Sequence, residues 1–401
     1  MWEQIRDNQI RSVILVTTMG IILLLIGWFI GFYFLDSPLL GLIIAALVWG
    51  VMNLIALFQG DSIILGMSGA KKIGPDDHPR LYNVVEEMKI ASGLQKMPDI
   101  YIIDDPALNA FSTGRDPDHA AVAITSGLLN KLNRDELQGV IGHEIGHISN
   151  RDIRLMMLAS ILLGTIVILS WYATRIMFFS GVGGRRSNSS SGGGIVMIII
   201  LVVGLVLMIL APIMAQLIYF AVSRRREYLA DASSALYTRY PDGLASALEK
   251  LENNDTKVRT ANKATAPMYI SNPFYKGKSS GMDLFATHPP LEDRIRILRS
   301  MHGASYTDYE DSYKEVKKDN MIPASALAGV AAVELRQASA GAQEGEVQEQ
   351  IDRSRETSDA LWRVHNYKSL NCANCGTGMR LPPGYDQPNV QCPHCGYINQ
   401  L

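Results

Sequence analysis

Four long runs without a charged side chain constrain the fold of this chain more than any other feature. They extend from Ser12 to Leu35, from Ser37 to Gly60, from Leu155 to Thr174 and from Ile195 to Ser223. A helix of about 20 apolar residues crosses the hydrocarbon core of a bilayer, so each run is long enough to do so. Buried core helices of a soluble protein are the alternative, but 48% of the residues are hydrophobic and they are concentrated in these runs. The pattern predicts a multi-pass protein with four transmembrane helices and the lipid bilayer as a partner.

The first run is longer than the apolar region of a secretory signal, and it leads into the second through Asp36 and Pro38. Basic residues beside the runs predict the orientation. They precede the first run at Arg6 and Arg11, precede the third at Arg151 and Arg154, and follow the fourth at Arg224, Arg225 and Arg226. A smaller, conflicting group lies between the third and fourth runs at Arg175, Arg185 and Arg186. We therefore expect both termini and the segment 61–154 on the cytoplasmic side of the cell or plasma membrane.

The segment between the second and third runs has the pattern of an α+β domain. Apolar residues recur at helical spacing from His78 to Leu94, and two short apolar stretches, Ile100 to Ile103 and Ala120 to Thr125, are typical of strands. Asn133 and Glu136 form a capping box that opens the next helix. That helix carries the sequence HEIGH at residues 143–147 and is long enough to continue into the third run.

The HEIGH sequence predicts a catalytic metal site. His143 and His147 lie four residues apart, so on a helix both imidazoles face one point and can bind one ion. Glu144 stands beside the first ligand and can activate a water for attack on a carbonyl. Two histidines at this spacing also fit a helix surface without metal, so the third ligand matters.

Glu227 is the candidate third ligand. The third and fourth runs form a hairpin, which brings residues just before and just after it to the same side of the membrane. Glu227 follows the hairpin directly, and Asp231 lies one helical turn beyond it, placed to orient a ligand histidine. The alternative is that Glu227 pairs with the neighbouring arginines at a helix start.

These motifs together resemble a known family. HEIGH, EYLAD at 227–231, NAFSTG at 109–114 and HPPLEDR at 288–294 are similar to the HtpX-type membrane zinc metalloproteases, relatives of the CAAX prenyl proteases. The resemblance covers roughly residues 10–300. It implies a gluzincin-like catalytic domain with a small sheet, a catalytic zinc, and polypeptide substrates, in particular misfolded or damaged membrane proteins.

The resemblance also implies roles for residues that the sequence pattern alone leaves open. Asn109, Ala110 and Phe111 match an edge segment that pairs with the substrate backbone. His288 and Arg294 match a histidine and an arginine near the oxyanion. From the residues alone, His288 before two prolines fits a turn equally well, and Arg294 fits a solvated helix face. The remaining histidines, including His78, fit surface or turn positions.

All four cysteines lie in one C-terminal module. Cys372 and Cys375 form one pair, Cys392 and Cys395 the other, and a glycine follows each pair. The spacing is typical of a zinc ribbon with a closed, structural four-thiolate site. Two disulfides or a redox pair are the alternative, which a cytoplasmic location disfavours. Few cations surround the module, so we expect it to contact a protein partner, the substrate or the catalytic domain of the same chain, and no nucleic acid.

These expectations divide the chain into six parts. They are two N-terminal transmembrane helices at 1–60, catalytic parts at 61–154 and 224–302, a transmembrane hairpin at 155–223, a flexible tether at 303–371 and a zinc ribbon at 372–401. The competing interpretations are a protease that cleaves inside the membrane and a non-enzymatic scaffold whose metal is structural. Polar residues between HEIGH and the third run disfavour the first, and Glu144 disfavours the second.

Overall fold

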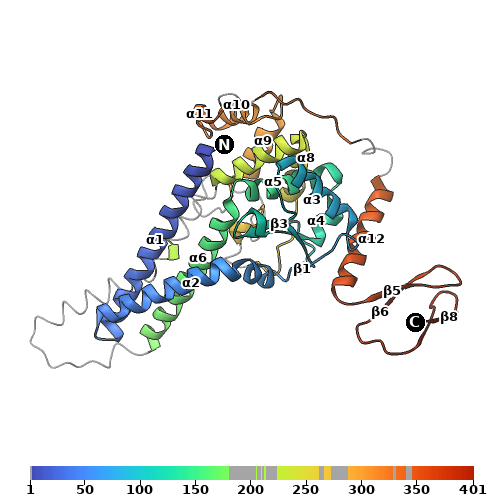
Figure 1. Ribbon diagram of the computed structural model, residues 1–401, viewed down its shortest axis with the longest axis horizontal. Coiled ribbons are helices and arrows are strands. Elements are labelled where there is room, and N and C mark those ends of the chain that lie inside the picture. Colours follow the sequence, from blue (N-terminus) through green and yellow to red (C-terminus); the bar gives the residue numbers. More distant parts are fainter. Residues whose placement is uncertain are drawn as a thin grey trace, which may run out of the picture.

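Three long helices form an arm that extends away from the rest of the molecule (Figure 1). They are α1 (Trp2–Phe34), α2 (Pro38–Met67) and α6 (Asp152–Phe179). The structure, a computed structural model, describes residues 2–179, 205, 209, 212–213, 224–261, 266–271, 288–327, 331–339 and 346–401. The predicted fourth transmembrane run, 195–223, lies outside these residues apart from isolated positions.

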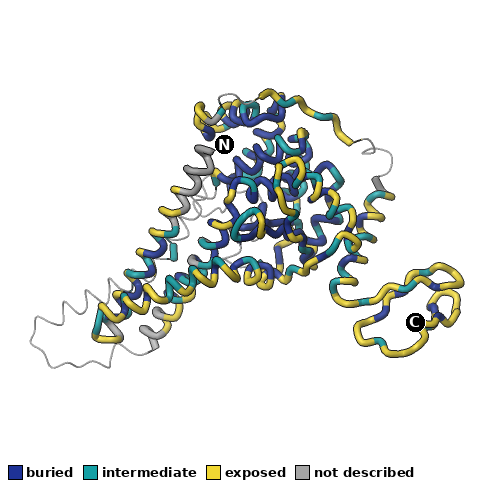
Figure 2. Tube along the Cα trace, in the orientation of Figure 1, coloured by how far each residue is buried: buried dark blue, intermediate teal, exposed yellow. Residues whose placement is uncertain are grey.

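Two helices of the described part are long and apolar enough to cross a membrane, at Pro38–Met67 and Asp152–Tyr172. A shorter apolar stretch, Val16–Phe32, lies within α1. Only 17% of the apolar window of α2 is buried, and Figure 2 shows α1 and α2 exposed along much of their length. Where the two helices pack, they approach closely: a Cβ on Gly41 would lie 2.2 Å from the carbonyl oxygen of Gly27. Small residues allow such contacts between apolar helices.

A four-stranded sheet lies beside this arm, in the order β1-β2-β4-β3. Its strands are β1 (Lys71–Lys72), β2 (Asp99–Ile103), β3 (Ala110–Gly114) and β4 (Ala120–Thr125). The expected strands at 100–103 and 120–125 are confirmed as β2 and β4, which pair in parallel, and β3 pairs antiparallel to β4 at the edge.

Side chains along a strand point alternately to the two faces of the sheet, so β4 contributes buried residues to a core on each face. Val122 and Ile124 of β4 join the main core with α3 (Pro79–Ser92), α5 (Arg134–Ser149) and α8 (Pro241–Glu252). Ala121 and Ala123 face the ends of α2 and α6 instead, against residues such as Ile64 and Met156. The helix α2 thus continues past residue 60, where we expected the transmembrane part to end, and its last turns pack on the sheet.

The helix with the HEIGH sequence stops before the third apolar run. The capping box of Asn133 and Glu136 is present at the start of α5. Arg151 has a φ of +60° between α5 and α6. A backbone in this left-handed region ends an α-helix, so the expectation of one continuous helix is not met.

The stretch 303–371, expected to be a flexible tether, contains helices that join the main core at several buried positions. In α10 (Tyr306–Lys317), Tyr309 is fully buried in the main core. In α12 (Glu346–Val364), Ala360 belongs to the same core, and Figure 2 shows buried residues along one part of α10. Composition suggested a tether because it is polar, but regularly spaced tyrosines supply an apolar face.

The remaining short elements complete the chain in order. They are η1 (Pro117–His119), α4 (Ser126–Lys131), helical residues 224–238, η2 (Ala266–Met268), α9 (Leu291–Arg299), α11 (Ala324–Leu327), β5 (Lys368–Asn371), β6 (Gly378–Leu381), β7 (Asn389–Gln391) and β8 (Ile398–Gln400). The last four form two antiparallel hairpins.

Candidate metal centre

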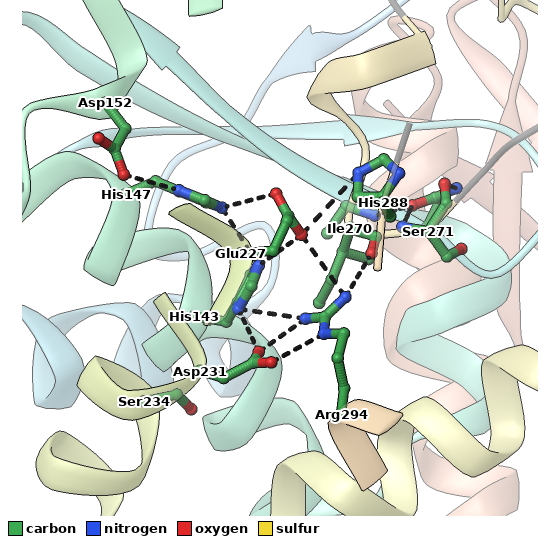
Figure 3. A network of polar contacts seen from close by, with 12 residues as sticks. His143, His147, Asp152, Glu227, Asp231, Ser234, Ile270, Ser271, His288 and Arg294 are labelled. Carbon is green, nitrogen blue, oxygen red and sulfur yellow. Dashed lines mark hydrogen bonds and ion pairs between the residues drawn. The ribbon is translucent and has the colours of Figure 1, made fainter. Parts of the chain in front are cut away.

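Two histidines and a glutamate from separate helices meet in the buried interior (Figure 3). His143 and His147 lie on α5, and Glu227 lies on the helical segment 224–238. Their candidate ligand atoms all lie within 4.8 Å of one another. The Nε2 atoms of the two histidines are 3.2 Å apart, and Glu227 oxygens lie 3.7 and 3.5 Å from them. The three residues that the sequence nominated as ligands are thus brought together.

Glycines on α5 allow this approach. A Cβ on Gly146 would lie 3.0 Å from Cβ of Ser233, and one on Gly142 would lie 3.1 Å from Oγ of Ser234. Both contacts are to the helical segment that carries Glu227. The missing side chains therefore let the two helices pack closely enough for Glu227 to reach the histidines.

Each histidine is held from behind by an aspartate. Nδ1 of His143 lies 2.9 Å from Asp231, and Nδ1 of His147 lies 3.3 Å from Asp152. An Nδ1–H that donates to a carboxylate leaves the lone pair on Nε2, as in metal-binding histidines. Asp231 was expected in this role. Asp152 was not, although its position five residues after His147 at the next helix start was a usable signal.

This geometry fits a cation. Two Nε2 lone pairs that face each other at 3.2 Å, beside a carboxylate, repel unless a positive charge lies between them. In the described part of the chain, Oε2 of Glu227 is buried without a hydrogen-bond partner. Burial lowers the pKa of His147, but Asp152 and Glu227 reverse this and raise it to about 10. A metal ion bound by three side chains with an open fourth position matches this donor set.

Glu144 lies buried beside these ligands. Burial raises its pKa, and the charges of His143 and His147 partly offset the rise. Neither oxygen makes a hydrogen bond of normal geometry to a described residue, although the Ser112 hydroxyl is near enough to lower the pKa slightly. A buried carboxylate with both oxygens uncommitted is suited to exchange a proton with a reactant.

Arg294 is fully buried, so the solvated helix face suggested by its sequence is wrong. Its Nε and Nη2 bind both oxygens of Asp231 at 2.8 and 2.7 Å, and its Nη1 donates to the carbonyl of Ile270 at 3.0 Å. Asp231 in turn raises the pKa of Arg294 despite burial. The guanidinium is therefore largely committed to holding Asp231.

His288 is buried next to Glu227 and is not a surface turn residue. Its Nε2 lies 3.9 Å from Oε2 of Glu227. Burial lowers the pKa of His288 to about 4, against the opposing effect of Glu227. The imidazole is therefore neutral at physiological pH.

The edge segment 109–111 is partly occupied by the chain itself. The Asn109 amide donates to the carbonyl of Ser271, and the carbonyl of Ala110 accepts a hydrogen bond from the backbone N–H of Ile270. The Phe111 side chain is buried against Tyr269. Backbone groups point outward at alternate residues, so the next outward-facing position on β3 is Ser112. No described residue pairs with its backbone there.

The four cysteines meet in a second cluster at the C-terminus. Their sulfurs lie within 4.8 Å of one another, and none forms a disulfide. Gly376 and Gly396, with φ of +71° and +73°, close the turn after each pair. Four converging thiols on two hairpins fit a closed tetrahedral metal site.

A HExxH helix, a glutamate from a second helix and aspartates behind both histidines together define the site of a metallopeptidase. Comparison with known proteins agrees. A family model described as peptidase family M48 matches residues 75–302. The chain belongs to this family and is a metalloprotease.

Named relatives are similar over most of their length. A protein of Dictyoglomus thermophilum described as a protease HtpX homolog is 45% identical to this chain over 300 residues, which is 75% of this chain and 94% of that protein. The Streptococcus pneumoniae relative shares 43% identity and is covered completely, again by 75% of this chain. The expected HtpX-type resemblance is confirmed. Among solved structures, S. mikatae Ste24p matches with 20% identity and a TM-score of 0.39, covering 74% of this chain and 67% of that one.

Proposed function

We propose that this protein is a membrane-anchored zinc endopeptidase that hydrolyses misfolded or membrane proteins at the cytoplasmic membrane surface. The observation that carries the proposal is the pair of Nε2 atoms 3.2 Å apart beside Glu227, each imidazole backed by an aspartate. The apolar helices α2 and α6 support the membrane location. Family membership supports polypeptide substrates.

His143, His147 and Glu227 would hold the zinc. When bound at such a site, zinc lowers the pKa of water and polarises a peptide carbonyl. Glu144 accepts the proton of the attacking water on a carboxylate oxygen and then delivers it to the nitrogen of the leaving amine. The raised pKa of Glu144 favours this proton transfer, because it makes the protonated carboxyl group more stable relative to the carboxylate.

The neighbouring residues take separate parts. Neutral His288 is placed to donate a hydrogen bond to the carbonyl oxygen as negative charge develops on it. Arg294 acts as a positioning residue, because its hydrogen bonds hold Asp231 and so His143. Of the edge segment, we propose that the backbone of Ser112 on the side away from β4, where no described residue pairs with it, binds the substrate, and that Asn109, Ala110 and Phe111 fix the strand.

The C-terminal cluster is proposed to hold a second, structural zinc through Cys372, Cys375, Cys392 and Cys395. Arg380, one of the few cations nearby, is bound to Asp359 and lies over the ring of Trp362. This supports a protein partner for the ribbon over nucleic acid.

The Glu144→Gln variant tests the enzyme proposal. We expect it to hold about two zinc ions per chain, like the parent, and to cleave an unfolded casein-like substrate roughly 1,000-fold more slowly. Zinc content and cleavage are measured on purified full-length protein in detergent. Equal cleavage by the variant, or no cleavage by a zinc-loaded parent, would instead favour a scaffold with structural metal.

A further inference from the structure

A cavity of about 780 Å³ lies where the membrane arm meets the catalytic domain. Its walls come from α1, α2, the loop around η1 and the first turns of α6. These elements lie together near the junction in Figure 1. The cavity is separate from the metal centre, and the mechanism above makes no use of it.

One side of the cavity is apolar. It is lined by Val13 and Val16 of α1, Trp49 of α2, and Leu155 and Leu158 of α6. Val13 is 66% exposed although it lies in an apolar run. The indole Nε1 of Trp49 is buried and has no hydrogen-bond partner among the described residues. The wall on this side is apolar, so an occupant of this side must be largely hydrocarbon.

The other side carries positive charge. Arg151 and Arg154 line the cavity and form no ion pair with any residue in the described ranges. Arg115 pairs with Asp116 at 3.4 Å, and Asp118 is a further carboxylate in the lining. Three arginines and two aspartates leave a net charge of +1, which one phosphodiester would neutralise.

Arg151 occupies an unfavourable backbone conformation. Its φ of +60° is one that glycine or asparagine adopts more readily than arginine. An arginine nevertheless stands at this position, and its side chain lines the cavity at the break between α5 and α6. This placement is consistent with a function for its guanidinium.

We propose that this cavity binds one anionic phospholipid of the leaflet that contacts the catalytic domain. The phosphate lies between Arg151 and Arg154, and an acyl chain lies along Val16 and Leu158. Basic pockets between transmembrane helices recognise anionic headgroups by this combination of charge and apolar surface. Asp152, which holds His147, follows Arg151 directly, so the lipid binds beside a residue that orders the metal centre.

The test measures lipid retained by the full-length protein. The protein is purified in detergent, mixed with equal amounts of phosphatidylglycerol and phosphatidylcholine, and analysed by native mass spectrometry. We expect one phosphatidylglycerol to be retained in preference to phosphatidylcholine. The Arg151→Gln/Arg154→Gln variant should bind phosphatidylglycerol roughly 30-fold more weakly.

The matched control is Arg296→Gln/Arg355→Gln, which removes the same charge from two exposed positions outside the cavity. It should retain phosphatidylglycerol like the parent. Zinc content and circular dichroism check that every variant is folded.

Equal retention of both lipids by the parent, or equal loss of phosphatidylglycerol in the control and the cavity variant, overturns the proposal. The proposal is also overturned if an apolar transmembrane peptide displaces the lipid equally well from the parent and from the Arg151→Gln/Arg154→Gln variant. That result would make the cavity a substrate site. The readout is bound lipid, so these failures leave the protease proposal untouched.

Discussion

At the scale of single residues, the metal centre is organised by the groups behind its ligands. Asp231 and Asp152 fix the ring orientation and tautomer of His143 and His147. Arg294 neutralises Asp231, and Arg226 lies 3.8 Å from Asp152. Each ligand histidine is therefore backed by an aspartate, and each aspartate has an arginine beside it. Burial makes these contacts strong, since little water competes with them.

Replacing the aspartate behind one ligand should weaken metal binding without removing a ligand. We expect Asp152→Asn to lower zinc affinity at the catalytic site about 10- to 100-fold, because the amide no longer favours the correct imidazole tautomer. Competition with a chelator, followed by zinc analysis, measures the change. Asp311→Asn, an exposed position, is the control. An unchanged affinity for Asp152→Asn would show that His147 is ordered by other contacts.

At the scale of elements, the site depends on the close packing of two helices. Gly146 faces Ala230 and Ser233, one to two turns from Glu227. Glu227 and the two histidines are distant in sequence, so the spacing of these helices decides whether the three can share an ion.

The Gly146→Ala substitution should push these helices apart. The added methyl would meet Cβ of Ser233 at 3.0 Å and Cα of Ala230 at 3.2 Å, so the helices must shift by a few tenths of an ångström. We expect a loss of about 1–3 kcal/mol in stability and several-fold weaker zinc binding. Thermal unfolding and chelator competition measure both. Gly66→Ala adds a methyl into open space and should change neither.

The contact between α3 and α12 should depend on pH. His78, expected at the surface, is fully buried as the N-cap of α3, where its Nδ1 accepts from the N–H of Leu81 and its Nε2 donates to Thr357 of α12. Burial lowers its pKa more than Glu356 raises it. The unfolded state then binds the proton more strongly, so stability is lost as pH falls below about 6.5.

Limited proteolysis measures this effect. We expect cleavage within α12 to rise between pH 7.5 and pH 5 in the parent. His78→Asn keeps a helix-capping side chain without a titrating group, so its cleavage should change little over this range. The same pH response in both proteins would assign the effect to another group.

At the scale of the whole molecule, the membrane arm and the catalytic domain share one packed structure. The ends of α2 and α6 cover one face of the sheet, and the main core lies on the other. The C-terminal ribbon follows α12, which docks on α4 and α3 through Ala360 and Thr357. The two metal clusters therefore lie in separate parts of the fold.

Disrupting the ribbon should leave the catalytic site intact. We expect Cys372→Ser/Cys392→Ser to lose one of two zinc ions and to unfold the two hairpins, because such small sheets depend on their metal. Cleavage of an unfolded substrate should persist, whereas Ser369→Ala should change neither property. Zinc analysis and cleavage assays on the full chain measure this. Loss of all cleavage with the catalytic zinc retained would assign the ribbon a part in substrate recruitment.

The sequence by itself determined the features that depend on local spacing. Helical periodicity placed His143 and His147 on one face, the pair spacing of the cysteines predicted their cluster, and two short apolar stretches predicted β2 and β4. The length of the apolar runs predicted helices long enough to span a bilayer. Each of these follows from contacts between residues a few positions apart, so a local pattern is sufficient evidence.

Only the tertiary structure decided which distant residues share an environment. Arg294 looks like part of a solvated helix and is buried on Asp231, and His78 is buried against a helix that follows it by more than 250 residues. Ile270 occupies the strand edge at Ala110, and Tyr309 turns a polar stretch into part of the core. Burial of these groups is set by packing between remote segments, which local spacing does not encode. The same packing brought Glu227 to His143 and His147 and so completed the candidate metal centre.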